Sequence, residues 1–333
     1  MLGSAWGRIG ITFALASAAF AAAAVSTVRP PEPAPVYVTW EGIGPDKWAS
    51  IWLLRRHIDP QAEIHFVDPG VMPDDGTAFD IPGSDYMRAG PITTFEALLA
   101  SDLGSGIDSP DVARMAEIIN EMEVSRWHIT ASSNTGLVER GFRNLQFRFD
   151  RDAVPFSCYM SFFDNLETLI DRADGGPVDP SILDTGDRLC EHLPENGKTQ
   201  SQTVQEMQAR TVLETLGKGA NIVFVDTRER AEFDEFHIPG AVHMPLREVS
   251  AERMAQFADA DLVIPYCVKD FRGFEVARAM SSLGVQNVAI MNPYGIRGWR
   301  NVGLPVAGDL AMSQPDAMAA LSSCASNPDG CLQ

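Results

Sequence analysis

A cysteine with two cations close behind it carries the clearest chemistry in this sequence. Cys267 opens the stretch Cys267-Val268-Lys269-Asp270-Phe271-Arg272-Gly273. Residues 261–266 before it form an apolar run typical of a strand, and residues 274–280 after it have apolar positions at helical spacing. The thiol is therefore predicted at a helix N-terminus, where backbone N–H groups and the helix dipole favour an anion. With Lys269 and Arg272 nearby, we expect a lowered pKa and a nucleophilic sulfur at Cys267. The competing interpretation is a free cysteine that only packs.

Motifs on both sides of this loop resemble those of the rhodanese domain family. They are Val225-Asp226-Thr227-Arg228-Glu229, Phe236-His237-Ile238-Pro239-Gly240-Ala241, Met244-Pro245-Leu246 and Gly298-Trp299-Arg300-Asn301-Val302-Gly303-Leu304-Pro305-Val306. The resemblance implies an α/β domain with a five-stranded parallel sheet and flanking helices, in which Cys267 carries sulfur as a persulfide. Arg272 gives the loop the form Cys-x4-Arg, which is the sulfurtransferase length; related phosphatases use Cys-x5-Arg.

The resemblance also implies roles for the other loop residues. Lys269 and Arg272 would hold a small anionic sulfur donor such as thiosulfate, and the acceptor would be a thiol or cyanide, with no cofactor. Many family members have glycine where this chain has Asp270, whose carboxylate would either repel the donor or point outward. The remaining substrate-binding candidates are Val268, Phe271 and Gly273, and the residues expected to be structural are Asp226, Arg228 and His237.

Strands that alternate with helical stretches predict a parallel sheet in this region. We expect a helix over residues 201–216 and strands at Ile222–Asp226, 242–244, Leu262–Tyr266 and 285–291. The residues from Met312 onward have no clear prediction.

Residues 36–173 resemble the chromate-resistance domain family. The matching motifs are Asp46-Lys47-Trp48-Ala49-Ser50-Ile51-Trp52-Leu53-Leu54-Arg55-Arg56, Ile58-Asp59-Pro60, Phe79-Asp80-Ile81-Pro82-Gly83, Thr94-Phe95-Glu96 and Ala116-Glu117-Ile118-Ile119. We expect a mixed α/β or mainly helical domain with an amphipathic helix over residues 48–58. Family members often carry histidines where this chain has Gly44 and Asn120, so no metal site is predicted. The weak candidates that remain are Asp46, Glu96, Glu121 and Glu123, and such carboxylates suit hard cations.

The whole chain has 333 residues and a net charge of −19, and it contains no basic block, which argues against a nucleic-acid partner. Residues 1–28 include an uncharged Ala-rich run, predicted to be a signal peptide or, alternatively, an uncleaved inner-membrane anchor. In the first case the protein is periplasmic or otherwise exported; in the second, this segment is its contact with the membrane. The further expected parts are a Pro-rich tether (29–35), a linker (174–198), the rhodanese-like domain (199–311) and a tail (312–333).

Export would favour disulfides among the five cysteines. The expected pairs are Cys324–Cys331 and Cys158–Cys190, which leave Cys267 free; the alternative is that all five are reduced or merely buried.

Two functions remain in competition. The first is an exported sulfurtransferase that works through a Cys267 persulfide. The second is a non-catalytic rhodanese-like docking or redox-sensing module, joined to a first domain that binds an oxyanion or a metal.

Overall fold

The computed structural model describes residues 34–68, 70–124, 134–149, 151, 153–173, 176 and 204–332. The predicted leader, residues 1–28, and nearly all of the predicted linker, residues 174–198, lie outside these ranges. Within the described part of the chain, no helix has both the length and the apolar character needed to cross a membrane.

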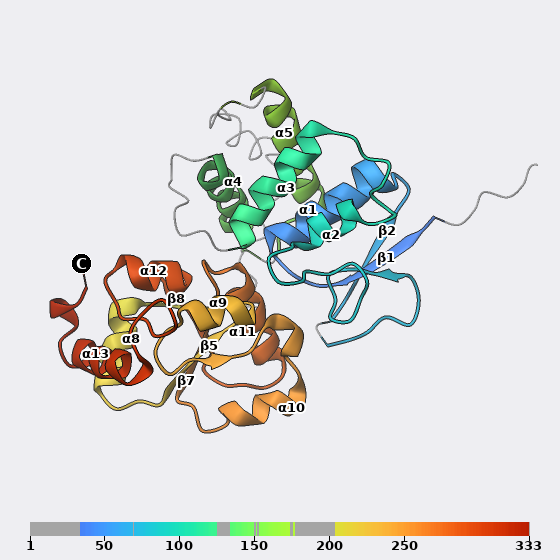
Figure 1. Cartoon of the computed structure of the whole chain (residues 1–333). Helices are drawn as coiled ribbons and strands as arrows, with labels where there is room; N and C mark the ends of the chain where they lie inside the picture. The colour runs from blue at the N-terminus through green and yellow to red at the C-terminus, as the bar shows by residue number, and fades with distance from the viewer. Residues whose placement is uncertain are drawn as a thin grey trace, which may run out of the picture. The chain divides into compact units, whose positions relative to one another are not determined.

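The first region is mixed α/β. Its three-stranded parallel sheet has the order β2-β1-β3, formed by β1 (Val36–Trp40), β2 (Glu63–Val67) and β3 (Thr77–Ala78). Helix α1 (Pro45–Leu53) packs against α2 (Thr94–Ala100), α3 (Pro110–Glu123) and α5 (Phe156–Ala173), and α4 (Asn134–Arg148) packs against α3 and α5 (Figure 1).

Helix α1 lies at the centre of this region. Pro45 occupies its first turn, where the missing N–H costs nothing, and all nine of its residues are buried. The predicted helix over residues 48–58 is therefore correct in kind, but it begins earlier and continues as a π-helical turn, Leu54–Ile58. Because other helices surround α1, even its polar residues Asp46 and Lys47 are inside the protein.

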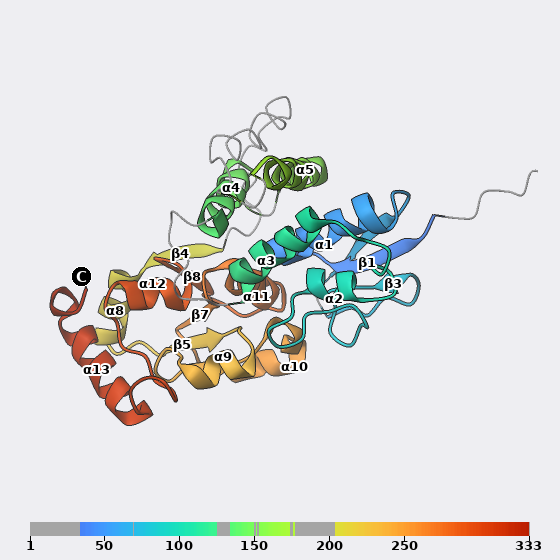
Figure 2. The same cartoon turned by 45° about the horizontal axis from the view of Figure 1, so that its top comes forward.

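The second region contains five parallel strands in two sheets. The order β6-β5-β7 joins Val242–His243, Ile222–Asp226 and Leu262–Tyr266, and the order β4-β8 joins Gln205–Gln208 and Ala289–Asn292. Helix α11 (Phe271–Ser282) packs against β7 and β8, and α8 (Ala209–Gly217) packs against β4 and β8 (Figure 2). The other helices are α9 (Arg230–Glu235), α10 (Ala251–Met254), α12 (Gly295–Asn301) and α13 (Gln314–Ser326), with short 3-10 turns at Leu246–Glu248, Ala255–Phe257 and Pro328–Gly330.

Three predictions for this region are wrong. The five-stranded sheet is replaced by sheets of three and two strands, which are linked by a parallel bridge between Val263 and Val288. The predicted helix over residues 201–216 begins only at Ala209, because β4 pairs with β8 before it. The strand predicted at 285–291 begins at Ala289.

The cysteines divide into bonded and free. The predicted Cys324–Cys331 disulfide is confirmed, and it closes the end of α13 onto the turn that follows. Cys158 is disulfide-bonded, and its predicted partner, Cys190, lies outside the described residues. Cys267 is free and buried.

Candidate active site

The loop that begins with Cys267 joins β7 to α11 and is held by α12. Gly273 allows α11 to approach β7 closely, since a Cβ there would lie 3.0 Å from Tyr266 Cα. The N–H groups of Ile296 and Arg297 donate to the carbonyls of Cys267 (2.9 Å) and Val268 (3.0 Å). Gly295 has a φ of +63°, and a Cβ at this position would lie 1.9 Å from the carbonyl oxygen of Lys269. The loop is therefore fixed from two sides.

The thiol of Cys267 is only 4% exposed. Burial raises its pKa above the ordinary value; the charge of Arg272 and the N–H of Gly273 act in the opposite direction, and the Glu123 and Asp270 carboxylates raise the pKa further. The lowered pKa predicted from the sequence is therefore wrong, because burial and two carboxylates outweigh the nearby cation.

Both predicted donor-binding cations are already engaged with carboxylates. The ammonium of Lys269 is buried and pairs with Glu139 of α4. Arg272 Nη2 donates to the backbone carbonyl of Glu123 at 2.9 Å. Its Nε lies 3.7 Å from the Glu123 carboxylate, and its Nη1 lies 3.5 Å from Glu232. An anionic donor would have to compete with these groups.

Asp270 is 1% exposed and pairs with two arginines of the first region. Arg143 Nη2 lies 2.5 Å from its Oδ1, and Arg151 Nη2 donates to its Oδ2. Burial would raise the pKa of Asp270, but the two arginines outweigh it and hold that pKa below the usual value. The carboxylate is inside the protein and paired, so the interpretation that it points outward is wrong. Its repulsion of a donor stays a prediction.

Apolar contacts extend this arrangement. Phe271 belongs to the core of the first region and meets Phe142 edge-on, with ring centroids 5.8 Å apart. The Arg143 guanidinium lies 4.5 Å from the Phe271 ring centroid, and that of Arg151 lies 4.2 Å from the Phe274 ring centroid. Sequence reasoning missed Arg143 and Arg151, and no local signal pointed to them, since Arg151 and Asp270 are 119 positions apart.

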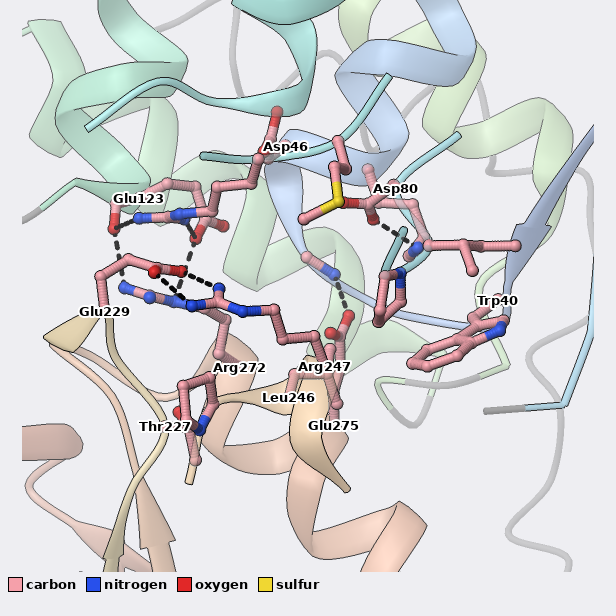
Figure 3. Close-up of a pocket in the computed structure, with 17 residues that line it drawn as sticks. Trp40, Asp46, Asp80, Glu123, Thr227, Glu229, Leu246, Arg247, Arg272 and Glu275 are labelled. Carbon is pink, nitrogen blue, oxygen red and sulfur yellow. Dashed lines mark hydrogen bonds and ion pairs between the residues drawn. The ribbon is translucent and has the colours of Figure 1, made fainter. Parts of the chain in front are cut away.

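A cavity lies beside Arg272, at the end of the loop, and residues of both regions line it (Figure 3). Arg247 makes two hydrogen bonds to Glu229, of 2.6 and 2.8 Å. Glu275 accepts the N–H groups of Ile43 (2.6 Å) and Gly44 (2.8 Å). The lining thus mixes paired charges with apolar side chains, among them Trp40, Ile81, Pro82 and Leu246.

Asp46 is a buried acid of this cavity. Its oxygens accept the N–H groups of Thr94 (2.8 Å) and Phe95 (2.9 Å) at the start of α2. Burial, with help from Asp80 and Glu123, raises the pKa of Asp46 to about 7.

The other weak metal candidates have separate partners. Glu96 accepts the N–H of Thr93 (2.8 Å) in the capping box of α2, and Glu121 accepts the hydroxyl of Thr135 (2.6 Å). Arg88 Nη1 donates to Glu123 at 3.2 Å. Within the described residues, no three His, Cys, Asp or Glu side chains are arranged to hold a metal ion.

Asp226 and Arg228 form a fully buried pair at the carboxyl end of β5. Asp226 Oδ2 accepts from Arg228 Nη2 at 2.7 Å, and the same Nη2 donates to the carbonyl of Phe236 at 2.6 Å. His237 connects α9 to α13: its Nδ1 lies 2.8 Å from the carbonyl oxygen of Phe233, and its Nε2 lies 3.2 Å from Gln314 Oε1.

Comparison with protein families gives two matches, one in each region of the chain. Residues 208–301 match the rhodanese-like domain model. Residues 37–170 match the model for the ChrB C-terminal domain. The chain therefore joins a ChrB-like region to a rhodanese-like region.

Relatives of known name cover only parts of the chain. Protein ChrB of Cupriavidus metallidurans is 32% identical over 109 residues, which are 32% of this chain and 33% of ChrB. The "Putative sulfur carrier protein YrkF" of Bacillus subtilis is 29% identical over 109 residues, 33% of this chain and 56% of that protein. Among solved structures, a thiosulfate sulfurtransferase from Pseudomonas aeruginosa is 27% identical, with a TM-score of 0.27, over 36% of this chain and 24% of that one. The BH2092 protein from Bacillus halodurans is 25% identical, with a TM-score of 0.30, over 32% of this chain and 79% of that one.

Proposed function

We propose that the chain is a sulfur carrier in which Cys267 holds one sulfane sulfur as a persulfide. The observation that carries the proposal is a free thiol that opens a Cys-x4-Arg loop between β7 and α11, in the region that matches the rhodanese-like model. The Gly273 N–H lowers the pKa of this thiol, and a fixed donor of this kind stabilises negative charge on a thiolate or a persulfide. The printed name of the Bacillus subtilis relative, a sulfur carrier, agrees with this proposal.

In the proposed first step, the Cys267 thiolate attacks the outer sulfur of a sulfane donor such as thiosulfate. A new S–S bond forms while the S–S bond of the donor breaks, and sulfite leaves with the bonding electron pair. In the second step, the thiolate of an acceptor attacks the outer sulfur of the persulfide, and Cys267 leaves as a thiolate. Because burial raises the pKa of Cys267, the first step should accelerate as the pH rises toward that pKa.

Mass spectrometry after incubation with thiosulfate tests the proposal. The peptide that contains Cys267 should gain the mass of one sulfur atom, and a reducing thiol should remove it. The Cys267→Ser variant, which has a similar size but a poor nucleophile, should gain nothing. If neither thiosulfate nor glutathione persulfide modifies Cys267, the chain is not a sulfur carrier.

A docking or redox-sensing module is the second candidate. The burial and the raised pKa of Cys267 favour docking, because both make the thiol less reactive. A docking module predicts that sulfane donors and a mild oxidant such as hydrogen peroxide both leave Cys267 unmodified, whereas a redox sensor predicts that only the oxidant modifies it, to a sulfenic acid. The two reagents, applied to the same protein, therefore separate the two functions.

We also propose export through residues 1–28, either as a cleaved signal or as an anchor. The Cys324–Cys331 disulfide supports this proposal, since such bonds persist in oxidising compartments. N-terminal sequencing of the protein from fractionated cells tests it. A start near residues 22–25 in the soluble exported fraction indicates cleavage, an intact start in the membrane fraction indicates an anchor, and an intact start in the cytosol refutes export.

A further inference from the structure

A second cavity touches the cysteine loop and shares no lining residue with that of Figure 3. Its walls come from α4, from Lys269 of the loop and from α12. Among the residues that the structure describes, four cations and one carboxylate, that of Glu139, line it; the cations are Arg140, Arg143, Lys269 and Arg297. The chain as a whole has 26 basic and 45 acidic residues, so a lining with this balance is a local reversal of the charge.

The carboxylate of Glu139 is shared by two of these cations. Its Oε1 accepts from both Nε and Nη2 of Arg143, each at 3.0 Å, and its Oε2 pairs with Lys269. Arg143 Nη1 is buried, and within the described part of the chain it has no acceptor. A buried donor without an acceptor is costly, but this atom has almost no accessible surface, so an anion in the cavity would act on Arg143 through its charge.

The cations also crowd one another. Burial lowers the pKa of Lys269, Glu139 partly restores it, and the positive charges of Arg143 and Arg297 lower it further. An anion in the cavity would relieve this repulsion as well as accept hydrogen bonds.

We infer that this cavity binds a small anion of the phosphate or sulfate type. The three arginines suit a tetrahedral dianion, because guanidinium groups present several donors in a fixed planar array. The cavity has a volume of about 300 Å³, at the lower end of the range for small-molecule sites. Arg140 is exposed and Arg297 half-buried, so a ligand can reach the site from solvent.

The site joins α4 to the loop that holds Cys267, so occupancy would add contacts between the ChrB-like and rhodanese-like regions. The inference does not depend on sulfur transfer, because sulfate and phosphate contain no sulfane sulfur. Failure of the proposed function would leave the binding measurement intact, and the reverse is also true.

Calorimetric titration of the full chain with sodium sulfate and sodium phosphate, at constant ionic strength set with chloride, tests the inference. We expect saturable binding at one site, weakened at least tenfold in Arg140→Gln/Arg297→Gln. The matched control is Arg114→Gln/Arg210→Gln, whose arginines are 39% and 48% exposed and lie outside the cavity, and which should bind like the wild type.

The single variant Arg140→Gln covers the case in which the double variant does not fold, because Arg140 is exposed. It should weaken sulfate binding severalfold. No saturable binding in the wild type, or equal weakening in the cavity variant and the control, would overturn the assignment.

Discussion

Removing the charge of Asp270 should destabilise the protein by about 3 kcal/mol, because breaking a buried ion pair typically costs about 3–5 kcal/mol. In Asp270→Asn, Arg143 keeps its hydrogen bonds to Glu139, both at 3.0 Å. Among the described residues, the ion pair that Arg151 keeps is with Glu206, 3.5 Å away and more exposed. One arginine thus retains a good partner, which places the expected loss at the lower end of that range.

Urea unfolding at neutral pH, followed by tryptophan fluorescence, measures this loss. The matched control is Asp234→Asn, which breaks an ion pair whose partners, Arg230 and Asp234, are 69% and 43% exposed. Exposed pairs are worth at most about 1 kcal/mol, so the control should lose little. The folded-state pKa of Asp270 is depressed, so its contribution is present above the unfolded pKa and disappears as the pH falls through the folded one. Wild type and Asp270→Asn should therefore converge at acid pH. Equal losses in the two variants at neutral pH would refute the buried ion-pair account.

Three further predictions follow from the site and the fold. Glu123→Gln should accelerate alkylation of Cys267 at pH 7, because it removes a carboxylate that raises the pKa of the thiol and lies 3.7 Å from Arg272. An unchanged alkylation rate would contradict this prediction. Asp46 keeps its proton to about pH 7 in the folded state, so stability should fall between about pH 4 and 7, by up to about 1.4 kcal/mol per pH unit. The urea midpoint of Asp46→Asn should fall less over this pH range than that of the wild type. Parallel plots of midpoint against pH for the two proteins would show that Asp46 does not cause the pH dependence. Cys331→Ser should lower the free energy of unfolding in urea by about 2–3 kcal/mol, because the disulfide restricts the unfolded chain and the loop that it closes is short. A loss under about 0.5 kcal/mol would contradict this prediction.

Features encoded by neighbouring residues could be predicted from the sequence. β5 and β7 have the predicted bounds, because each is an apolar run between turn residues. The position of Cys267 between strand and helix follows from the same local pattern. Helix α13 carried a readable signal that was missed: Ser313 caps it, Pro315 lies in its first turn, and Asp316 follows.

Features that depend on distant residues could not be predicted. β4 is short and polar, and only its pairing with β8 makes it a strand. The flanking cations suggested a low pKa for Cys267, but the pKa depends on burial and on Glu123, which lies in another region of the fold. The partners of Asp270 and Lys269 also come from α4 and its surroundings, so the charge seen by the thiol is a tertiary property.

The hydrogen bonds between α12 and the cysteine loop have an evolutionary consequence. Consecutive N–H groups, of Ile296 and Arg297, take consecutive carbonyls, of Cys267 and Val268, while Gly295 leaves no room for a side chain beneath Lys269. Inserting one residue between Cys267 and Lys269 would move these carbonyls out of step with a helix that stays in place. A lineage that lengthens the loop there must therefore alter two segments separated in the sequence, whereas an insertion after Lys269 leaves the carbonyls paired.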